Sequence, residues 1–394
     1  MRLTAQVVRA ARIAAQHLDA RLPAGTEVIA AAPGLRDTPA GTFHDALAAR
    51  TDGSGRQLAP SGGVSRRLDA AETGLVAIWG PRGAPYVVAK ADLAIFTRGA
   101  LPVDEASARA FAPSAAKALG PHGITLLDAF GQVERAMRAA VADGPVERDA
   151  MHQQLREALP GELLWACKGC GTDHVHPMVW RGACTMGSVR RDDASPSRAV
   201  TYASVASPPD PAGDAPARAE ITRRALRYHG PLTLVEVATW LAVSPADVRV
   251  RLDAIVAELE EVDREGEQAW ALAADLELLA EPPAPHGVRL LAAGDPLLDG
   301  RDRASLIPDP ALRKEVWKAL ASPGVVLADG ELVGTWRAKV RGGHLEVALT
   351  PLGGAQLPAA ERLAPEADAL AAARGLASAT IVRAEPPGMP RQTI

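Results

Sequence analysis

The chain has 394 residues, 47% of them apolar and 23% charged, which is enough to bury several small cores in a globular protein. A formal net charge of −4 excludes a uniformly basic protein that coats nucleic acid, but it allows a positive groove on an otherwise acidic surface. Aromatic residues make up only 4%, so the base-stacking surfaces of single-strand binders are not expected.

A winged-helix order, in which helices are followed by a strand hairpin, is expected over residues 1–100. Thr4 is placed to cap a first helix, and a shorter helix is expected to begin near Thr42. Apolar residues over 75–90 then predict a hairpin that turns at Gly80-Pro81-Arg82-Gly83.

The same order can be traced over residues 101–202, although the two segments are too different in sequence to establish a repeat. Apolar periodicity predicts helices near 104–119, 125–141 and 146–159. A wing that contains cysteine and histidine is expected to follow them. A Pro-rich linker over 203–217 separates this segment from the next.

The third winged helix, over residues 218–280, gives the clearest local signals. Its first helix is expected to stop at His229-Gly230-Pro231, and Thr233 with Glu236 forms a capping box for the second helix. Ser244 is placed to cap a helix over 245–260, and a short hairpin over 261–272 completes the unit.

Beyond Pro283 the pattern changes to strands. Strands are predicted over 286–291, 324–328, 332–340, 344–349 and 379–383, with helices over 308–320 and 358–374. Residues 281–394 are therefore expected to form a β-barrel-like domain. The predicted fold class is α+β, with three tandem winged-helix domains followed by this C-terminal domain, in a monomer.

No run of about 18 apolar residues free of charge occurs, and the amino terminus shows no signal-peptide core. We therefore expect a cytoplasmic protein with no membrane partner. The three cysteines all lie between Cys167 and Cys184, too few and too clustered for a secreted disulfide framework.

Cys167 and Cys170 have the C-x2-C spacing that lets two thiolates share one tetrahedral zinc ion, and His174 and His176 follow closely as further ligands. Such a zinc would be structural, and no cofactor is required for catalysis. A metal-free pair of thiols in a wing is an equally open interpretation. A redox function is less favoured, because no βαβ pattern surrounds the motif.

Arginines are placed where they could follow the backbone of a duplex. Trp180-Arg181 and Arg190-Arg191 predict a basic wing. The complete set of predicted DNA contacts is Arg36, Arg82, Arg181, Arg190, Arg191, Arg223, Arg224 and Arg227. The would-be recognition helix over 245–260 also carries four acidic residues, which argues against docking in the major groove like an ordinary repressor.

Several stretches resemble the AlkZ/YcaQ-type winged-helix DNA glycosylase family, and the resemblance covers nearly the whole chain. Residues 290–298 with Arg301-Asp302-Arg303, and residues 324–330 with 333–337, look like the C-terminal signatures of the family. Residues 34–39 (Gly-Leu-Arg-Asp-Thr-Pro) resemble its active-site segment, and residues 82–88 resemble the hairpin that follows it.

The resemblance implies a bacterial protein that binds double-stranded DNA and is nucleoid-associated when bound. It would hydrolyse the N-glycosidic bond of bulky or N7-alkylated purines in base excision or crosslink repair. The active-site pattern of the family is Gln, any residue, then Gln or Asp. Ungapped placement puts Arg36 and Thr38 on the polar positions, and a one-residue shift puts Leu35 and Asp37 there, so the leading Gln is missing.

Asp37 and Thr38 are therefore the candidate catalytic residues. An N7-alkylated purine is already cationic and needs little acid catalysis, so a carboxylate that positions water and offsets the oxocarbenium charge suits the reaction. No lysine is placed by a motif to form a Schiff base, which predicts a monofunctional enzyme. Asp37 equally suits a structural role in the turn ahead of a helix.

Two other functions stay open at this point. A non-catalytic winged-helix DNA-binding protein or regulator would explain the missing Gln. A scaffold whose winged helices bind proteins would fit the acidic helix and the net charge of −4.

Overall fold

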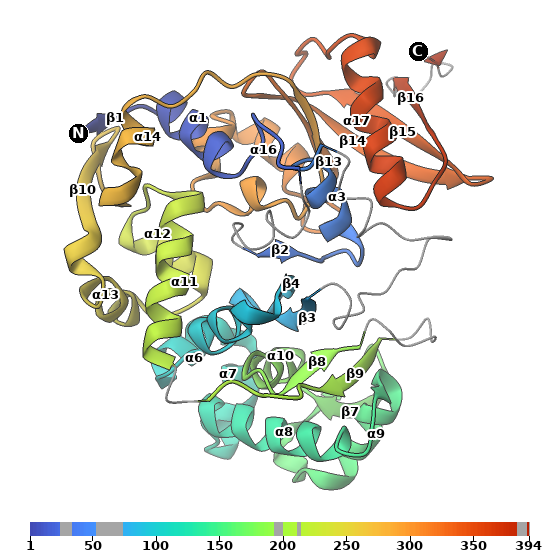
Figure 1. Cartoon of the computed structure of the whole chain (residues 1–394). Helices are drawn as coiled ribbons and strands as arrows, with labels where there is room; N and C mark the ends of the chain where they lie inside the picture. The colour runs from blue at the N-terminus through green and yellow to red at the C-terminus, as the bar shows by residue number, and fades with distance from the viewer. Residues whose placement is uncertain (24–33, 53–73, 193–199, 211–213, 384–391, 394) are drawn as a thin grey trace. The chain divides into compact units, whose positions relative to one another are not determined.

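The computed structural model describes residues 1–23, 34–52, 74–192, 200–210, 214–383 and 392–393 (Figure 1). They form a mixed fold of short helices and small sheets, which confirms the α+β class. They group into two compact units. The first consists of Met1–Arg66, Leu226–Thr233 and Glu260–Ile394, and the second of Arg67–Ala225 and Leu234–Leu259. The number of winged helices and the five continuous domains stay predictions.

The second unit contains mostly short elements. Its strands are β3 (Leu75–Trp79), β4 (Pro85–Ala89), β5 (Val146–Glu147), β6 (Leu164–Cys167), β7 (Thr172–Val175), β8 (Val189–Arg191) and β9 (Thr201–Ser204). Its helices are α5 (Leu93–Phe96), α6 (Glu105–Phe111), α7 (Pro113–Leu119), α8 (Leu126–Ala140), α9 (Arg148–Ala158), α10 (Pro177–Thr185), α12 (Leu234–Leu241), α13 (Pro245–Asp253) and most of α11 (Asp214–His229).

The core of the second unit forms around α8. The Thr125 hydroxyl accepts the amide of Asp128 at 3.1 Å, so the predicted helix begins with a side-chain cap. The apolar face of α8 packs Phe130 and Met137 among Phe111 and Trp180. Antiparallel strands line this core: the hairpin β3–β4, the three-stranded sheet β5-β9-β8 and the hairpin β6–β7.

Three predicted segments of the second unit are wrong in detail. The helix expected over 104–119 is two helices, because Pro113 restricts Ala112 to an extended φ of −131° and begins a new helix. The linker expected over 203–217 is shorter, since β9 and α11 occupy its two ends. The helix expected over 245–260 ends at Asp253, and the chain then enters a strand that pairs with two others.

The prediction that Trp180 and Arg181 lie in a basic wing is also wrong. These residues lie on α10, which begins because Pro177 occupies the first helical position and the His176 side chain accepts the amide of Met178 at 3.2 Å. Arg190 and Arg191 do lie on a strand, β8. His176, which the sequence predicts as a zinc ligand, therefore serves as a helix cap.

The first unit joins the two ends of the chain. Its helices are α1 (Ala5–Ala15), α3 (Thr42–Ala48), α14 (Leu276–Ala280), α15 (Arg303–Leu306), α16 (Pro310–Val316) and α17 (Ala360–Ala373). Its strands are β1 (Arg2–Leu3), β2 (Leu35–Arg36), β10 (Leu259–Arg264), β11 (Glu267–Leu272), β12 (Val288–Leu291), β13 (Gly324–Ala328), β14 (Glu331–Arg341), β15 (His344–Pro351), β16 (Ala379–Arg383) and β17 (Gln392–Thr393).

Two sheets organise the first unit. Strand β1 pairs in parallel with β10, which forms the predicted hairpin with β11. The second sheet has six strands in the order β12-β13-β14-β15-β16-β17, and α17 carries the chain between the parallel strands β15 and β16. Over the part of the chain that the structure describes, β12 and β17 are the edges of an open sheet. Closure into a barrel stays a prediction.

One core is shared by the amino-terminal and carboxy-terminal segments. Ile13 and Leu18 from the first segment pack with Leu291, Leu297 and Val325 from the last. Figure 1 shows the blue helix α1 beside the orange elements of the same unit. Within the described ranges, no helix has both the length and the hydrophobicity that a membrane span requires.

Arg50 and Asp295 form a fully buried ion pair that joins these segments. The two guanidinium nitrogens of Arg50 donate to the Asp295 carboxylate at 2.7 and 2.9 Å, and the side chains are 1% and 0% exposed. Arg50 also donates to the Ala46 carbonyl and to the Gln16 side chain. These hydrogen bonds to both guanidinium Nη atoms and both carboxylate oxygens offset much of the cost of burial.

A second buried cluster fixes the last turn of α1. The Arg12 guanidinium donates to the Gly230 carbonyl at 3.1 Å and pairs with Asp302 at 2.7 Å, and Arg264 reaches Asp302 at 3.3 Å. Burial alone would raise the pKa of the Asp302 carboxyl, but the two guanidinium groups outweigh burial and hold that pKa below its usual value. Asp302, which the sequence offered only as part of a signature, is thus a structural anion.

We predict that Arg50→Met lowers the free energy of unfolding by about 3 to 5 kcal/mol, because it leaves the Asp295 carboxylate buried without a cation. Urea denaturation measures the change. Arg341→Met is the matched control, since Arg341 is 60% exposed and pairs with Glu346 at the surface. That control should lose about 0 to 1 kcal/mol. Equal losses in the two variants would contradict a special contribution of the buried pair.

Candidate functional site

The segment that resembles the family's active site lies in the first unit, between β2 and α3. Asp37 is only 4% exposed. Its Oδ1 accepts the amides of Gly41 at 2.5 Å and Phe43 at 3.5 Å, where the chain turns into α3. Gly41 takes a φ of +90° there, which a residue with a Cβ rarely adopts. The structural role that the sequence allowed for Asp37 is therefore present, and its carboxylate is held in one orientation.

The two neighbours of Asp37 differ in exposure. Thr38 is exposed, whereas Arg36 is half-buried and its Nη1 lies 3.3 Å from the Asp299 carboxylate. Gly294 supports this turn from the carboxy-terminal segment: a Cβ on Gly294 would lie 3.0 Å from the Thr38 carbonyl oxygen. The first C-terminal signature thus packs closely against the active-site segment, and a larger residue at position 294 would press on the Thr38 carbonyl.

Sequence reasoning missed a second carboxylate beside Asp37. Asp45 on α3 is 2% exposed and binds the Arg374 guanidinium through both oxygens, at 2.9 and 2.7 Å. Burial raises the pKa of Asp45, the Arg374 guanidinium opposes that rise, and the negative charge of Asp37 adds to it. Arg374 lies 329 residues away in the sequence, so no local signal could have found this pair.

Most of the arginines that were predicted to bind DNA already have partners within their own unit. Arg223 binds Glu258 through two bonds of 2.7 Å, and Arg224 binds Asp92 at 2.7 and 2.9 Å. Carboxylates also pair with Arg36, Arg190 and Arg227. A guanidinium in such a pair must exchange its partner before it can bind a phosphate, which reduces the gain from that contact.

Arg82 and Arg181 are brought together from two motifs that are far apart in the sequence. Arg82 lies in the turn between β3 and β4, where its Nη1 donates to the Trp240 carbonyl at 2.8 Å. A Cβ added to Gly83 in the same turn would lie 2.7 Å from the Cβ of Arg181, so α10 packs tightly against the turn. Arg181 itself is exposed, as a phosphate contact requires, and Arg191 on β8 is half-buried.

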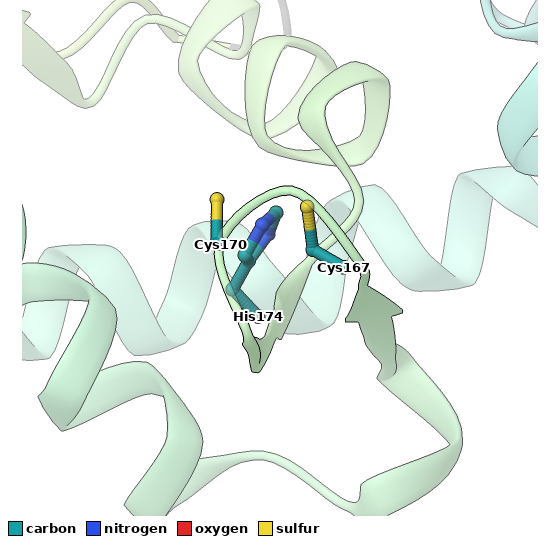
Figure 2. A group of neighbouring side chains, drawn as sticks. All are labelled: Cys167, Cys170 and His174. Atoms are coloured by element: carbon teal, nitrogen blue, oxygen red, sulfur yellow. The ribbon is translucent and has the colours of Figure 1, made fainter.

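The cysteine segment brings three of the four predicted zinc ligands together. Figure 2 shows Cys167, Cys170 and His174 at the turn of the β6–β7 hairpin, and their ligand atoms all lie within 4.8 Å of one another. His176 is not part of this group. Cys184 is buried on α10, where its sulfur lies 3.8 Å from that of Met137 in the core.

Comparisons with known proteins point to one family. The family model described as DNA glycosylase AlkZ-like matches residues 9–373. A relative named interstrand DNA cross-link repair glycosylase, from Streptomyces sahachiroi, is 31% identical over 178 residues, which are 41% of this chain and 45% of the relative. The alignment thus spans less than half of that relative's length.

A solved structure shows the same fold. The Streptomyces sahachiroi DNA glycosylase AlkZ matches with a TM-score of 0.72 and 20% identity, over 98% of this chain and 100% of the other. The family expected from residues 290–298 and 324–337 is therefore confirmed.

We predict that Arg374→Met destabilises the protein by about 3 kcal/mol near neutral pH, because it strips the cation from a buried carboxylate. The pKa of Asp45 is higher in the folded state than in the unfolded state, so folding favours the protonated carboxyl. The stabilisation from this proton is fully present below the unfolded-state pKa and is lost as pH rises through the folded-state pKa. Without Arg374 the folded pKa rises further. Urea denaturation at several pH values should show a deficit that is small in acid and grows with pH.

The double variant Asp45→Asn/Arg374→Met is the control for this effect. It carries no carboxylate at position 45, so the additional pH dependence should disappear. A deficit of the single variant that stays constant with pH would show that Arg374 acts through packing alone.

Proposed function

Because the chain belongs to the AlkZ-like family of DNA glycosylases, we propose that it hydrolyses the N-glycosidic bond of N7-alkylated or bulky purines in double-stranded DNA, crosslinked purines included. The match over residues 9–373 carries this proposal. The protein would act as a monofunctional enzyme and as a monomer in the bacterial cytoplasm, and it would leave an abasic site.

The chemistry of the substrate sets what the protein must supply. A cationic N7-alkylpurine leaves with the electron pair of the glycosidic bond and becomes neutral, while the oxygen of water bonds to C1′ and releases a proton. A carboxylate that orients this water and offsets the positive charge on the sugar lowers the barrier. We assign this role to Asp37, whose carboxylate is already held by the amides of Gly41 and Phe43.

Arg36 supports the alternative of a non-catalytic DNA-binding protein. It occupies the position of the leading Gln in the ungapped placement, and a guanidinium has five donors but no acceptor. Unlike the amide of Gln, it cannot accept a hydrogen bond from the attacking water. The pair with Asp299 gives this arginine a structural role instead.

The test is abasic-site formation on duplex DNA that carries N7-alkylguanine, with Asp37→Asn against the unchanged protein. Asparagine keeps an oxygen for the amides of Gly41 and Phe43 but loses the charge, so the turn is preserved. We expect activity to fall at least tenfold, which is about 1.4 kcal/mol of transition-state stabilisation. The same assay on an interstrand-crosslinked duplex then shows whether the protein also releases a crosslinked purine, which defines the size of lesion that it accepts.

Asp52→Asn serves as the matched control, because Asp52 is an exposed carboxylate that follows α3. It should keep full activity. Base release that is equal in the Asp37 variant and the control would leave the enzyme assignment standing but remove Asp37 from catalysis. Duplex binding without base release by the unchanged protein would select the non-catalytic alternative.

Among the eight arginines, we propose Arg181 as a phosphate contact. Arg181→Gln should weaken binding to duplexes of all sequences about equally and reduce the slope of log affinity against log salt by about 0.9. Fluorescence anisotropy at several salt concentrations measures both effects. Arg224→Gln is the control, since Arg224 already binds Asp92, and its slope should not change. An unaltered slope for Arg181→Gln would rule out the contact.

A further inference from the structure

Beyond the proposed glycosylase activity, we propose that Cys167, Cys170 and His174 bind one zinc ion, whose fourth position is filled by water or another small ligand. The three ligand atoms already lie within 4.8 Å of one another (Figure 2). Two thiolates and one imidazole select zinc among the common cellular cations, because magnesium and calcium prefer oxygen. No carboxylate belongs to the group that the described residues form.

The backbone of the turn holds the two cysteines close together. The amides of Cys170 and Gly171 donate to the Cys167 carbonyl at 3.2 and 2.9 Å and close a tight loop between the two cysteines. Gly171 has a φ of +65°, which completes the loop without the strain a side chain would add.

Both cysteines are free thiols, Cys167 half-buried and Cys170 exposed, so an ion can reach them from solvent. Zinc binds cysteine as the thiolate, so binding at this site would release the two thiol protons.

His174 is oriented for coordination through one nitrogen. Its Nδ1 lies 2.8 Å from the Val175 carbonyl oxygen, so Nδ1 carries the proton and Nε2 is the lone-pair nitrogen. A backbone carbonyl that holds the far nitrogen in this way is the usual support of a zinc-bound histidine. The ring is 8% exposed, and the rings of His152 and Trp165 lie 5.3 and 5.7 Å from it. The imidazole therefore needs little rearrangement to bind.

The test uses the full-length chain, purified under reducing conditions without chelator. Elemental analysis should find about one zinc per chain. After removal of zinc, cobalt should restore the site and give the intense visible bands of a tetrahedral ion with a thiolate charge-transfer band. Cys167→Ser and His174→Ala should each abolish the cobalt spectrum.

Lys168→Ala is the matched control, because it lies in the same loop and offers no ligand of the proposed set. His176→Gln tests whether His176 is a further ligand, and this variant should retain the metal. Absence of zinc from the unchanged protein, together with the absence of a cobalt spectrum, would overturn the proposal without reference to any variant. Full metal content in Cys167→Ser would overturn it too. Base release plays no part in these measurements, so they stand apart from the glycosylase proposal.

Discussion

The buried bond between Arg50 and Asp295 connects the segment expected to carry the chemistry with the far end of the chain. Asp295 accepts both guanidinium nitrogens and also the Leu297 amide at 3.0 Å, so its position fixes the turn that follows β12. The residue before it, Gly294, lies against the Thr38 carbonyl. Since neither charge can be left alone in this interior, Arg50 and the turn that follows β12 keep one arrangement.

Local signals predicted the elements well where the chain depends mostly on its own sequence. Strands β13 and β16 have the predicted bounds, and the predicted helix caps of Thr4 and Ser244 are present. The predictions failed where the outcome depends on distant partners or on one proline. Residues 259–260 joined a strand because β10 pairs with β1 and β11, and Pro113 divided a helix whose apolar periodicity runs through it.

The candidate site was predictable only in part, for a similar reason. A carboxylate at Asp37 and a C-x2-C loop are local patterns, and both were found from the sequence. An isolated arginine, by contrast, looks the same whether it meets a phosphate or a carboxylate of its own protein. Arg223 finds Glu258 at 35 residues' separation and Arg374 finds Asp45 at 329, and no pattern in the letters connects such partners.

The discontinuity of the first unit also shapes how the protein is made. Strand β1 pairs Arg2 with Asp263, and the core that receives Ile13 is completed by residues from Leu291 to Leu352. At ordinary synthesis rates the amino-terminal segment waits roughly 13 to 70 seconds for these partners to be made. The second unit, most of whose residues lie in between, emerges in full before then. The first residues made are thus among the last to find their places, and their apolar side chains lack their final partners during that interval.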